Sequence, residues 1–357
     1  MEIYFYQAEC GDAARITYEG TDGKKHHVFI DAGYERTFGH VLKETIKECE
    51  HIDLWVVSHI HDDHIGGVIS YLDALRRKEI SVQVSEWLYN PPRVSLAGAN
   101  TVLAASEIKS IGQGDALWQY LLKTGKQSAQ DITSNTPAKE LHGLKFQILS
   151  PSTEKLEKLR TKYANPFVPL EREEDMKISS AKGLAKAYDY ATKIADFDLE
   201  RWKEDGNPDN GSSITFLTDL NGFKVLWLAD AHPRDVVSGL KKLGYSSAAP
   251  LVCDWVKVTH HGSKGNNNNE LYEMVSCSNY LFSVNGENIH YLPNKESMAR
   301  ILRNKNRNIS KQRYKFYFTY DNPTMRSIFK SDGEEIFSDW NFEVIYPKGK
   351  WIKVPVT

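Results

Sequence analysis

The sequence lacks a cysteine motif, a long apolar run and an excess of charge of either sign. Its four cysteines are widely scattered among 357 residues and form no CxxC pair, which argues against a disulfide framework and against a thiolate zinc site. No apolar run approaches the roughly 18 residues that span a bilayer, and the opening MEIYFYQAEC has no basic region followed by an apolar one. We therefore expect a cytoplasmic protein without membrane contact, in which the cysteines are buried as small apolar side chains.

The composition favours a folded chain with a large core. Hydrophobic residues make up 41% of the chain and charged residues 26%, which suits one large domain or two smaller ones. The formal net charge of -2 provides no overall attraction to nucleic acid or to anionic membranes, so any such affinity must come from local patches.

Hydrophobic periodicity in the first quarter of the chain predicts alternating strands and helices. A β-hairpin with its turn at EGTDGKK is followed by a helix over 38–50, a buried strand over 52–59, a helix over 66–79 and a strand over 80–90. This order predicts an α/β sandwich. Functional loops of such folds usually lie at the carboxyl ends of buried strands.

The rest of the chain predicts a helical insertion, further strands and a C-terminal extension. Residues 151–205 are charged and predict helices, one with a buried face that carries Leu184, Tyr188, Ala191, Ala195 and Trp202. A hairpin is expected around Asn221 and Gly222, and the NNNN run at 266–269 predicts a mobile loop. We expect a main domain over 1–300 and an extension over 301–357 packed on the same domain.

Side chains that bind metals follow three predicted strands. The stretch SHIHDDHIGG supplies four of them after LWVVS, Asp230 follows VLWLA, and two histidines follow VKVT. Imidazole and carboxylate are ligands for zinc, manganese and iron, and burying so many polar groups costs free energy unless something pairs with them. The candidates are His59, His61, Asp63, His64, Asp230, His260 and His261.

These residues carry a resemblance to a known family. The pattern H-x-H-x-D-H within SHIHDDHIGG resembles the signature of the metallo-β-lactamase-fold hydrolases. With CGDAARI, FIDAG, LWLADA and VTHHGS, the chain is similar to the nuclease-type domain of the competence protein ComEC and its free-standing relatives, over most of residues 1–300 apart from the insertion. The resemblance implies an αββα sandwich with a helical insertion and a C-terminal extension.

The resemblance also implies two divalent metal ions, zinc or manganese. One ion would be held by His59 and His61, and the other by Asp63 and His64, while Asp230 bridges them and one further histidine, for which we choose His260, completes the set. Asp63 and Asp230 are then the carboxylates at the catalytic centre. Two such ions about 3.5–4 Å apart can activate a bridging hydroxide and stabilise both oxygens of a phosphoryl displacement.

Two departures from the family pattern bear on this site. A histidine often found before the bridging aspartate is absent from DNGSSITFL, and a histidine expected before a proline is replaced by Leu292. ComEC-like members also tend to lack the first of these, so the gap favours that subgroup. Around the metal ligands we expect supporting or substrate-binding roles for Asp31, Asn210, Ser212, His261, Ser263 and His290, and a close helix approach or a turn at Gly66 and Gly67.

Two stretches outside the motif have both a functional and a structural interpretation. RNKNRNISKQRYKFYF interleaves basic and aromatic residues as a nucleic-acid surface does, or it is a solvated helix end before an amphipathic strand. For WLYNPPR the two interpretations are stacking on a base at the edge of the site and packing in the core.

Three functions remain open from the sequence. The first is a metallo-phosphodiesterase or nuclease acting on nucleic acid or a nucleotide. The second is a metal-binding subunit of a multi-protein system, such as a defence system, with the insertion docking a protein partner. The third is a lactamase or thioesterase, because the same fold supports several hydrolytic reactions.

Overall fold

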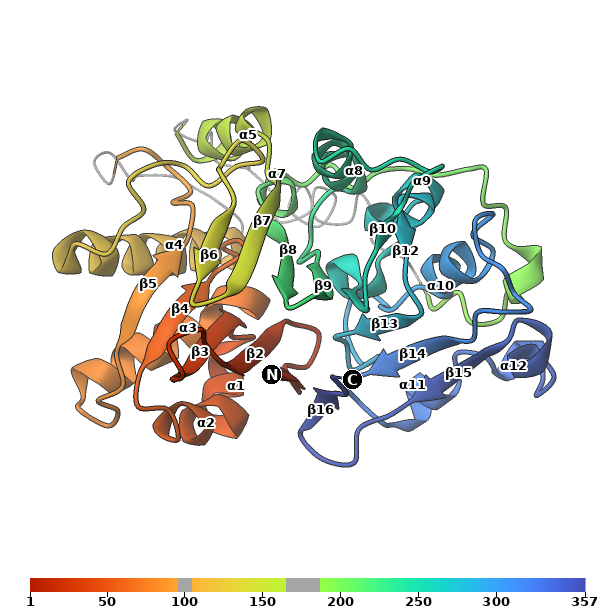
Figure 1. The fold of residues 1–357 in the computed structure, drawn as a ribbon, viewed down its shortest axis with the longest axis horizontal. Coiled ribbons are helices and arrows are strands. Elements are labelled where there is room, and N and C mark those ends of the chain that lie inside the picture. The colour runs from red at the N-terminus through yellow and green to blue at the C-terminus, as the bar shows by residue number, and fades with distance from the viewer. Residues whose placement is uncertain (96–104, 165–186, 357) are drawn as a thin grey trace.

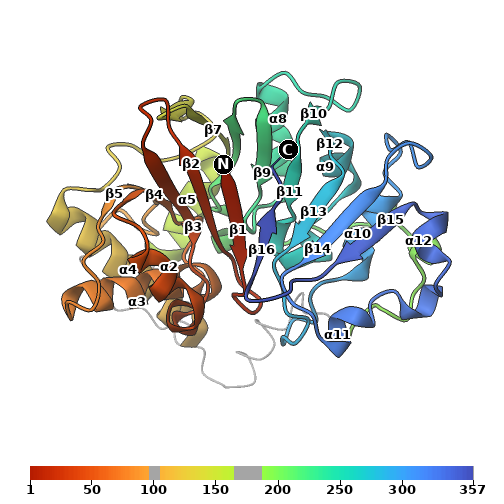
Figure 2. The ribbon, with the colours of Figure 1, turned by 60° about the horizontal axis from the view of Figure 1, so that its bottom comes forward.

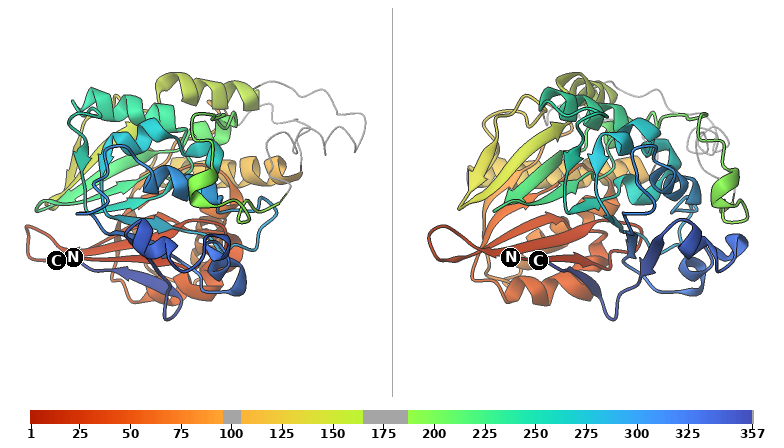
Figure 3. Two further views of the ribbon diagram at one scale, coloured as in Figure 1. Left: turned by 90° about the vertical axis from the view of Figure 1, so that its right-hand side faces the viewer. Right: turned by 45° about the vertical axis from the view of Figure 1, so that its right-hand side comes forward.

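The computed structural model describes residues 1–95, 105–164 and 187–356. Two mixed β-sheets pack face to face, and helices cover the outer face of each sheet (Figures 1 and 3). The predicted αββα sandwich is therefore confirmed by the arrangement of the chain itself. Within these residues, no helix is both long and apolar enough to cross a bilayer.

The first sheet is built mainly from the N-terminal part of the chain and has the strand order β16-β1-β2-β3-β4-β5. Its pairs from β16 to β3 are antiparallel, whereas β3, β4 and β5 are parallel. The strands are β1 (Glu2–Tyr6), β2 (Ala13–Glu19), β3 (Lys25–Asp31), β4 (Ile52–Val56), β5 (Val84–Leu88) and β16 (Trp351–Val354). The C-terminal strand β16 lies beside β1 (Figure 2), so the two ends of the chain meet in this sheet.

The second sheet has the order β15-β14-β13-β11-β9-β8-β7-β6. It is parallel from β15 to β9 and antiparallel from β9 to β6. Its strands are β6 (Lys139–Leu141), β7 (Leu144–Ser150), β8 (Thr215–Leu220), β9 (Phe223–Trp227), β11 (Trp255–Lys257), β13 (Asn279–Phe282), β14 (Tyr314–Phe318) and β15 (Phe342–Ile345). A short parallel pair, β10 (Leu251–Val252) and β12 (Val275–Ser276), stands apart.

Three buried apolar clusters hold these layers together. One lies between the sheets and joins residues such as Phe5, Leu54, Phe216 and Trp255; the other two lie between each sheet and its helices. The helices are α1 (Glu35–Thr37), α2 (Lys43–Lys47), α3 (Asp62–Arg76), α4 (Ala105–Thr124), α5 (Thr153–Ala164), α7 (Pro208–Gly211), α8 (Pro233–Lys242), α9 (Asn269–Glu273), α10 (Lys295–Leu302), α11 (Pro323–Arg326) and α12 (Ile336–Asp339). A π-helical turn, Phe38–Leu42, joins α1 to α2. All four cysteines are buried and free, as expected.

Most predicted elements are present, including the first hairpin, the buried strand β4 and the hairpin at Asn221 and Gly222, both of which have positive φ. The insertion is different from the prediction. Its start forms α5, but residues 187–202 form no α-helix and contain only a 3-10 turn, Ile194–Asp196. Leu184 lies outside the described residues. Tertiary contacts hold the described segment: Ile194 is buried, and Asp189 accepts hydrogen bonds from the N-terminus of α10.

The asparagine run is also different from the prediction. Asn266, Asn267 and Asn268 are buried, and their side chains hydrogen-bond to neighbouring backbone and side-chain groups. Asn268 caps α9 by accepting from the N–H of Leu271 at 2.8 Å. The low complexity of NNNN therefore marks an ordered turn rather than a mobile loop.

Candidate metal centre

The HxHxDH stretch connects β4 to α3, and part of it belongs to the helix. His59 follows the end of β4, His61 is the N-cap residue of α3, and Asp63 and His64 lie in the first turn. The periodicity predicts a helix that begins at Gly66, which is four residues after its actual start at Asp62. Because the first helical turn fixes the directions of Asp63 and His64, these two side chains are presented from a rigid element, whereas His59 lies in the preceding loop.

Two glycines allow that helix to pack closely on the chain after β3. A Cβ atom at Gly67 would overlap the carbonyl oxygen of Ala32, and one at Gly66 would overlap the backbone at Glu35. The N–H of Gly67 donates to the carbonyl of Gly33 at 2.9 Å. Close approach, one of the two roles expected for these glycines, is therefore what the structure shows.

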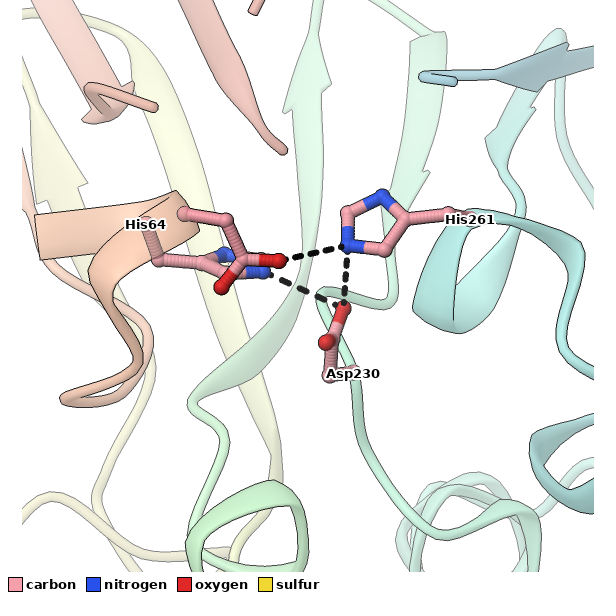
Figure 4. Close-up of side chains that lie close together, drawn as sticks. His64, Asp230 and His261 are labelled. Carbon is pink, nitrogen blue, oxygen red and sulfur yellow. Dashed lines mark ion pairs between the residues drawn. The ribbon is translucent and has the colours of Figure 1, made fainter. Parts of the chain in front are cut away.

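Asp230 lies at the centre of the cluster, directly after β9. Its Oδ1 is 3.3 Å from Nε2 of His64, and its Oδ2 is 3.9 Å from Nε2 of His59. Figure 4 shows Asp230 between His64, which comes from α3, and His261, which comes from the segment after β11. The shared carboxylate thus faces side chains from both sheets.

Both histidines of the HHGS stretch reach this carboxylate. Nε2 of His261 lies 3.6 Å from Oδ1 of Asp230 and 3.4 Å from Oδ2 of Asp63. Nε2 of His260 lies 3.6 Å from the other oxygen, Oδ2 of Asp230. The resemblance led us to expect His260 as the ligand and His261 in a supporting role. In the structure, His261 belongs to the candidate ligand group with Asp63, His64 and Asp230.

The arrangement fits a metal because its central atoms have no other partner. Five buried atoms have no hydrogen bond: Nε2 of His59, Nε2 of His64, Nε2 of His261, and Oδ1 and Oδ2 of Asp230. Buried polar atoms are normally satisfied, and leaving one unpaired costs about 1–3 kcal/mol. Such a group of unpaired atoms around the carboxylate of Asp230 is expected where cations bind. The two candidate ligand groups are His59, His61 and Asp230, and Asp63, His64, Asp230 and His261.

The charges of the site are strongly coupled to one another. Burial alone lowers the pKa of His64, but the carboxylates of Asp230 and Asp31 raise it well above its ordinary value. Burial alone raises the pKa of Asp230, but His260 and His64 hold it well below its usual range. The carboxylate is therefore ionised and ready to act as a ligand.

Asp31, at the end of β3, hydrogen-bonds to His64 and to Ser58. Its Oδ2 accepts a hydrogen bond from Nδ1 of His64 at 2.8 Å and one from the hydroxyl of Ser58 at 2.7 Å, and its Oδ1 accepts from the N–H of Ser58 at 2.7 Å. A hydrogen bond at Nδ1 leaves the lone pair of Nε2 directed at the centre.

A buried ion pair beside His261 was not predicted from the sequence. Asp12, in CGDA, pairs with the buried Lys257 of β11, and its Oδ1 lies 3.5 Å from Nδ1 of His261. His261 Nδ1 also hydrogen-bonds to the carbonyl of Ser283 at 2.8 Å. In the sequence, a lysine inside an apolar strand indicates that some acidic partner is needed, but it does not identify that partner.

Asn210, in the region of the missing histidine, contributes to the surroundings of the centre. Its Nδ2 donates to Oδ2 of Asp205 at 2.5 Å and lies 3.5 Å from Nδ1 of His260. Ser212 points away, since its hydroxyl donates to the carbonyl of Asp209 at 2.6 Å. Asp209, not foreseen, lies closer to the centre, with its Oδ2 3.8 Å from Nε2 of His61.

Two further predicted residues lie around the histidine pair. Ser263 closes the HHG turn by donating its N–H to the carbonyl of His260 at 2.7 Å. His290 is exposed, in the segment between β13 and α10.

The aromatic residues of the stretch after α10 do not form a base-stacking surface. Tyr314 and Phe316 are buried in the core, so they cannot stack on bases. Arg307 is buried as well, where it donates to the carbonyls of Trp340 and Asn341 and stacks on Tyr314. The structural interpretation therefore holds for the aromatic residues of this stretch and for Arg307.

The same holds for WLYNPPR. Trp87 is buried and stacks on Trp55 with ring centroids 5.4 Å apart. Tyr89 is buried too, and Arg93 pairs with Asp115. These side chains pack the core beside the centre.

Comparison with known proteins gives distant structural similarity only. No protein-family model matches the chain, and no curated protein matches it. Among solved structures, it is similar to Zn²⁺-bound PqqB from Methylobacterium extorquens (TM-score 0.41, 10% identity, 100% of both chains covered). It is also similar to the metallo-β-lactamase-fold protein YhfI from Bacillus subtilis (TM-score 0.38, 10% identity, covering 83% of this chain and 92% of that one).

A third similar structure is CmlA, a diiron β-hydroxylase from Streptomyces venezuelae, with a TM-score of 0.40 and 12% identity over 99% of this chain and 54% of that one. These scores are too low to carry an argument about activity. The case for a metal centre rests on the geometry described above.

Proposed function

We propose that this chain is a metal-dependent hydrolase with a dinuclear centre, and that its substrates are phosphodiesters. The observation that carries the proposal is the group of buried, unpartnered ligand atoms on both sides of Asp230. In this proposal His59, His61 and His260, near Oδ2 of Asp230, would hold one zinc or manganese ion, and Asp63, His64 and His261, near its Oδ1, would hold the other.

In this proposal His260 replaces the histidine that is absent from DNGSSITFL. With His59 and His61 alone, the first ion has two imidazole ligands besides Asp230. His260 faces the same oxygen of Asp230 as His59 does, so it supplies the third. Each ion would then be held by three side chains and one oxygen of Asp230, and a water or a substrate oxygen would add as a fifth ligand.

When bound, two such ions supply a Lewis acid and a water of lowered pKa. The chain's own residues hold that chemistry in place. Asp230 and Asp63 would serve as ionised ligands, Asp31 fixes the ring of His64, and in this proposal the exposed His290 contacts a phosphate oxygen or the leaving group.

The choice of phosphodiesters rests on the ComEC-like sequence motifs, and the substrate remains a nucleotide or a nucleic acid. Two lysines near the centre are already paired with acids: Lys162 with Asp209, and Lys109 with Asp62. A compact phosphodiester that binds through the ions themselves suits such a rim better than a long nucleic acid held by free cations does.

The experiment measures metal content and then hydrolysis of bis-p-nitrophenyl phosphate, a cyclic dinucleotide and single-stranded DNA with added Mn²⁺ or Zn²⁺. Turnover that is lost in His59→Ala and in Asp230→Asn, but kept in His40→Ala, is the expected result. His40 is exposed on the π-helical turn and serves as the control. Hydrolysis of a lactam or a thioester in place of the phosphodiesters would refute the substrate class. Bound metal without any turnover would favour a subunit that works with a protein partner.

A further inference from the structure

A second group of histidines and aspartates lies away from the candidate metal centre. Nε2 of His26 is 2.9 Å from Oδ1 of Asp22, and Nδ1 of His142 is 3.6 Å from Oδ2 of the same aspartate. The rings of His26 and His142 stack with centroids 3.9 Å apart. One ligand atom from each of these three residues lies within a single metal-sized group.

The group joins turns from the two different sheets. Asp22 lies in the turn between β2 and β3, and His142 in the turn between β6 and β7. The two turns lie side by side (Figure 2), and the N–H of Thr21 donates to the carbonyl of His142 at 3.0 Å. His26 precedes Asp31 by five residues of β3, so the group is about 17 Å along the strand from the candidate metal centre.

His26 is held as a metal-binding histidine is held. It is buried, with 3% of its side chain exposed, and its Nδ1 hydrogen-bonds to Oδ1 of Asp53 at 2.7 Å. Asp53 is itself fixed, because its Oδ2 accepts from the N–H of His27 at 2.7 Å and its Oδ1 lies 2.9 Å from Nε2 of His51. A carboxylate at one ring nitrogen orients the other nitrogen toward a metal and raises its basicity.

We propose that Asp22, Nε2 of His26 and Nδ1 of His142 form a separate zinc site that ties the two sheets together at this end of the sandwich. Two imidazoles and a carboxylate are a ligand set that zinc accepts, with water in the fourth position. Asp22 and His142 are 34% and 41% exposed, which provides access for the ion and for that water. Because His142 lies at the surface of a turn, its ring can rotate out of the stack toward the ion.

The ion binds on the side of Asp22 and not on the side of Asp53. Both oxygens of Asp53 are already engaged by the N–H of His27 and by the rings of His26 and His51. Oδ2 of Asp22, in contrast, faces only the ring of His142 in the described structure. Binding requires Nε2 of His26 to be unprotonated, so a proton bound there is released when zinc enters.

Zinc stoichiometry of the full chain, measured by equilibrium dialysis, tests this proposal without any need for activity. The wild type and His40→Ala are expected to bind one more zinc ion per chain than His142→Ala and Asp22→Asn do. Both of these substitutions lie in exposed turns, and Asp22→Asn keeps the size of the side chain. Hydrolysis at the candidate metal centre, whatever its substrate, is expected to be retained in all of these variants.

The additional zinc is also expected to persist in Asp230→Asn, in which the candidate metal centre loses its shared ligand. This variant separates the two sites, so failure of the proposed hydrolase function would leave this proposal standing. Equal zinc binding by the wild type, His142→Ala and Asp22→Asn would overturn it and leave His26 as a hydrogen-bonded imidazole between two carboxylates.

Discussion

His260 and His261 are neighbours in the chain, yet their rings face opposite oxygens of Asp230. Nε2 of His261 lies 3.6 Å from Oδ1 and Nε2 of His260 lies 3.6 Å from Oδ2. Both residues have positive φ angles, 45° for His260 and 53° for His261. Non-glycine residues rarely adopt this backbone conformation, which costs about 1–3 kcal/mol and persists where the surrounding structure demands it. Here it directs two consecutive imidazoles to the two sides of one carboxylate.

Single substitutions of these histidines are expected to remove different ions. His261→Ala should abolish binding of the ion held by Asp63 and His64. His260→Ala should weaken binding of the ion held by His59 and His61. Metal analysis with a substoichiometric chelator would show each variant with one ion of the pair lost or weakened. If His260→Ala binds both ions as tightly as the wild type does, His260 is not a ligand.

Asp31→Asn tests the support of His64. The amide can no longer accept at both oxygens from Ser58 and from the ring of His64, so the ring loses its orientation. Loss of such a partner typically weakens metal affinity by about 10–100-fold, and competition with a chromophoric chelator measures this change. Unchanged affinity in a folded Asp31→Asn protein would contradict the role given to Asp31.

Gly67→Ala tests the close packing of α3. The new Cβ would overlap the carbonyl oxygen of Ala32, so we expect a loss of about 1–3 kcal/mol in the free energy of unfolding and weaker metal binding as the first turn shifts. Gly112→Ala in α4 is the matched control, because its Cβ would meet no atom within 4 Å. That change should stabilise the protein by about 0.5–1 kcal/mol. Urea unfolding of both variants provides the comparison.

Asp189→Ala tests how the segment after the insertion is attached. The carboxylate accepts from the N–H groups of Lys295 at 2.7 Å and Glu296 at 3.0 Å, at the start of α10. Its removal should lower the free energy of unfolding by about 1–2 kcal/mol, as loss of a helix cap does. Asp198→Ala is the control, since Asp198 is 57% exposed and contacts only neighbouring residues. Equal stability of the two variants would show that Asp189 does not anchor the segment.

The candidate metal ligands can be found in the sequence because the motif is local. His59, His61, Asp63 and His64 fall within six residues at the end of an apolar strand, and Asp230 follows another such strand. Strand ends of one sandwich meet in space, so these positions converge without further information. The choice between His260 and His261 was beyond the sequence, because it depends on two unusual φ angles.

Residues 187–202 show where prediction of secondary structure from the sequence failed. The apolar spacing there is helical, but Asp189 and the buried Ile194 form specific contacts with α10 and with the residues after α11, and tertiary contacts override a weak periodicity. The ion pair of Asp12 and Lys257 is invisible for the same reason, since its two members are 245 positions apart and meet only when the sheets pack.

The most direct test of the account is a crystal structure of the zinc- or manganese-loaded chain with anomalous scattering measured at the metal edge. We predict two peaks at the centre, one on each side of Asp230, with His59, His61 and His260 around the first and Asp63, His64 and His261 around the second. The absence of a peak beside Asp230 in metal-loaded crystals would contradict a metal centre. A single peak that leaves His260 without contact would contradict the dinuclear arrangement.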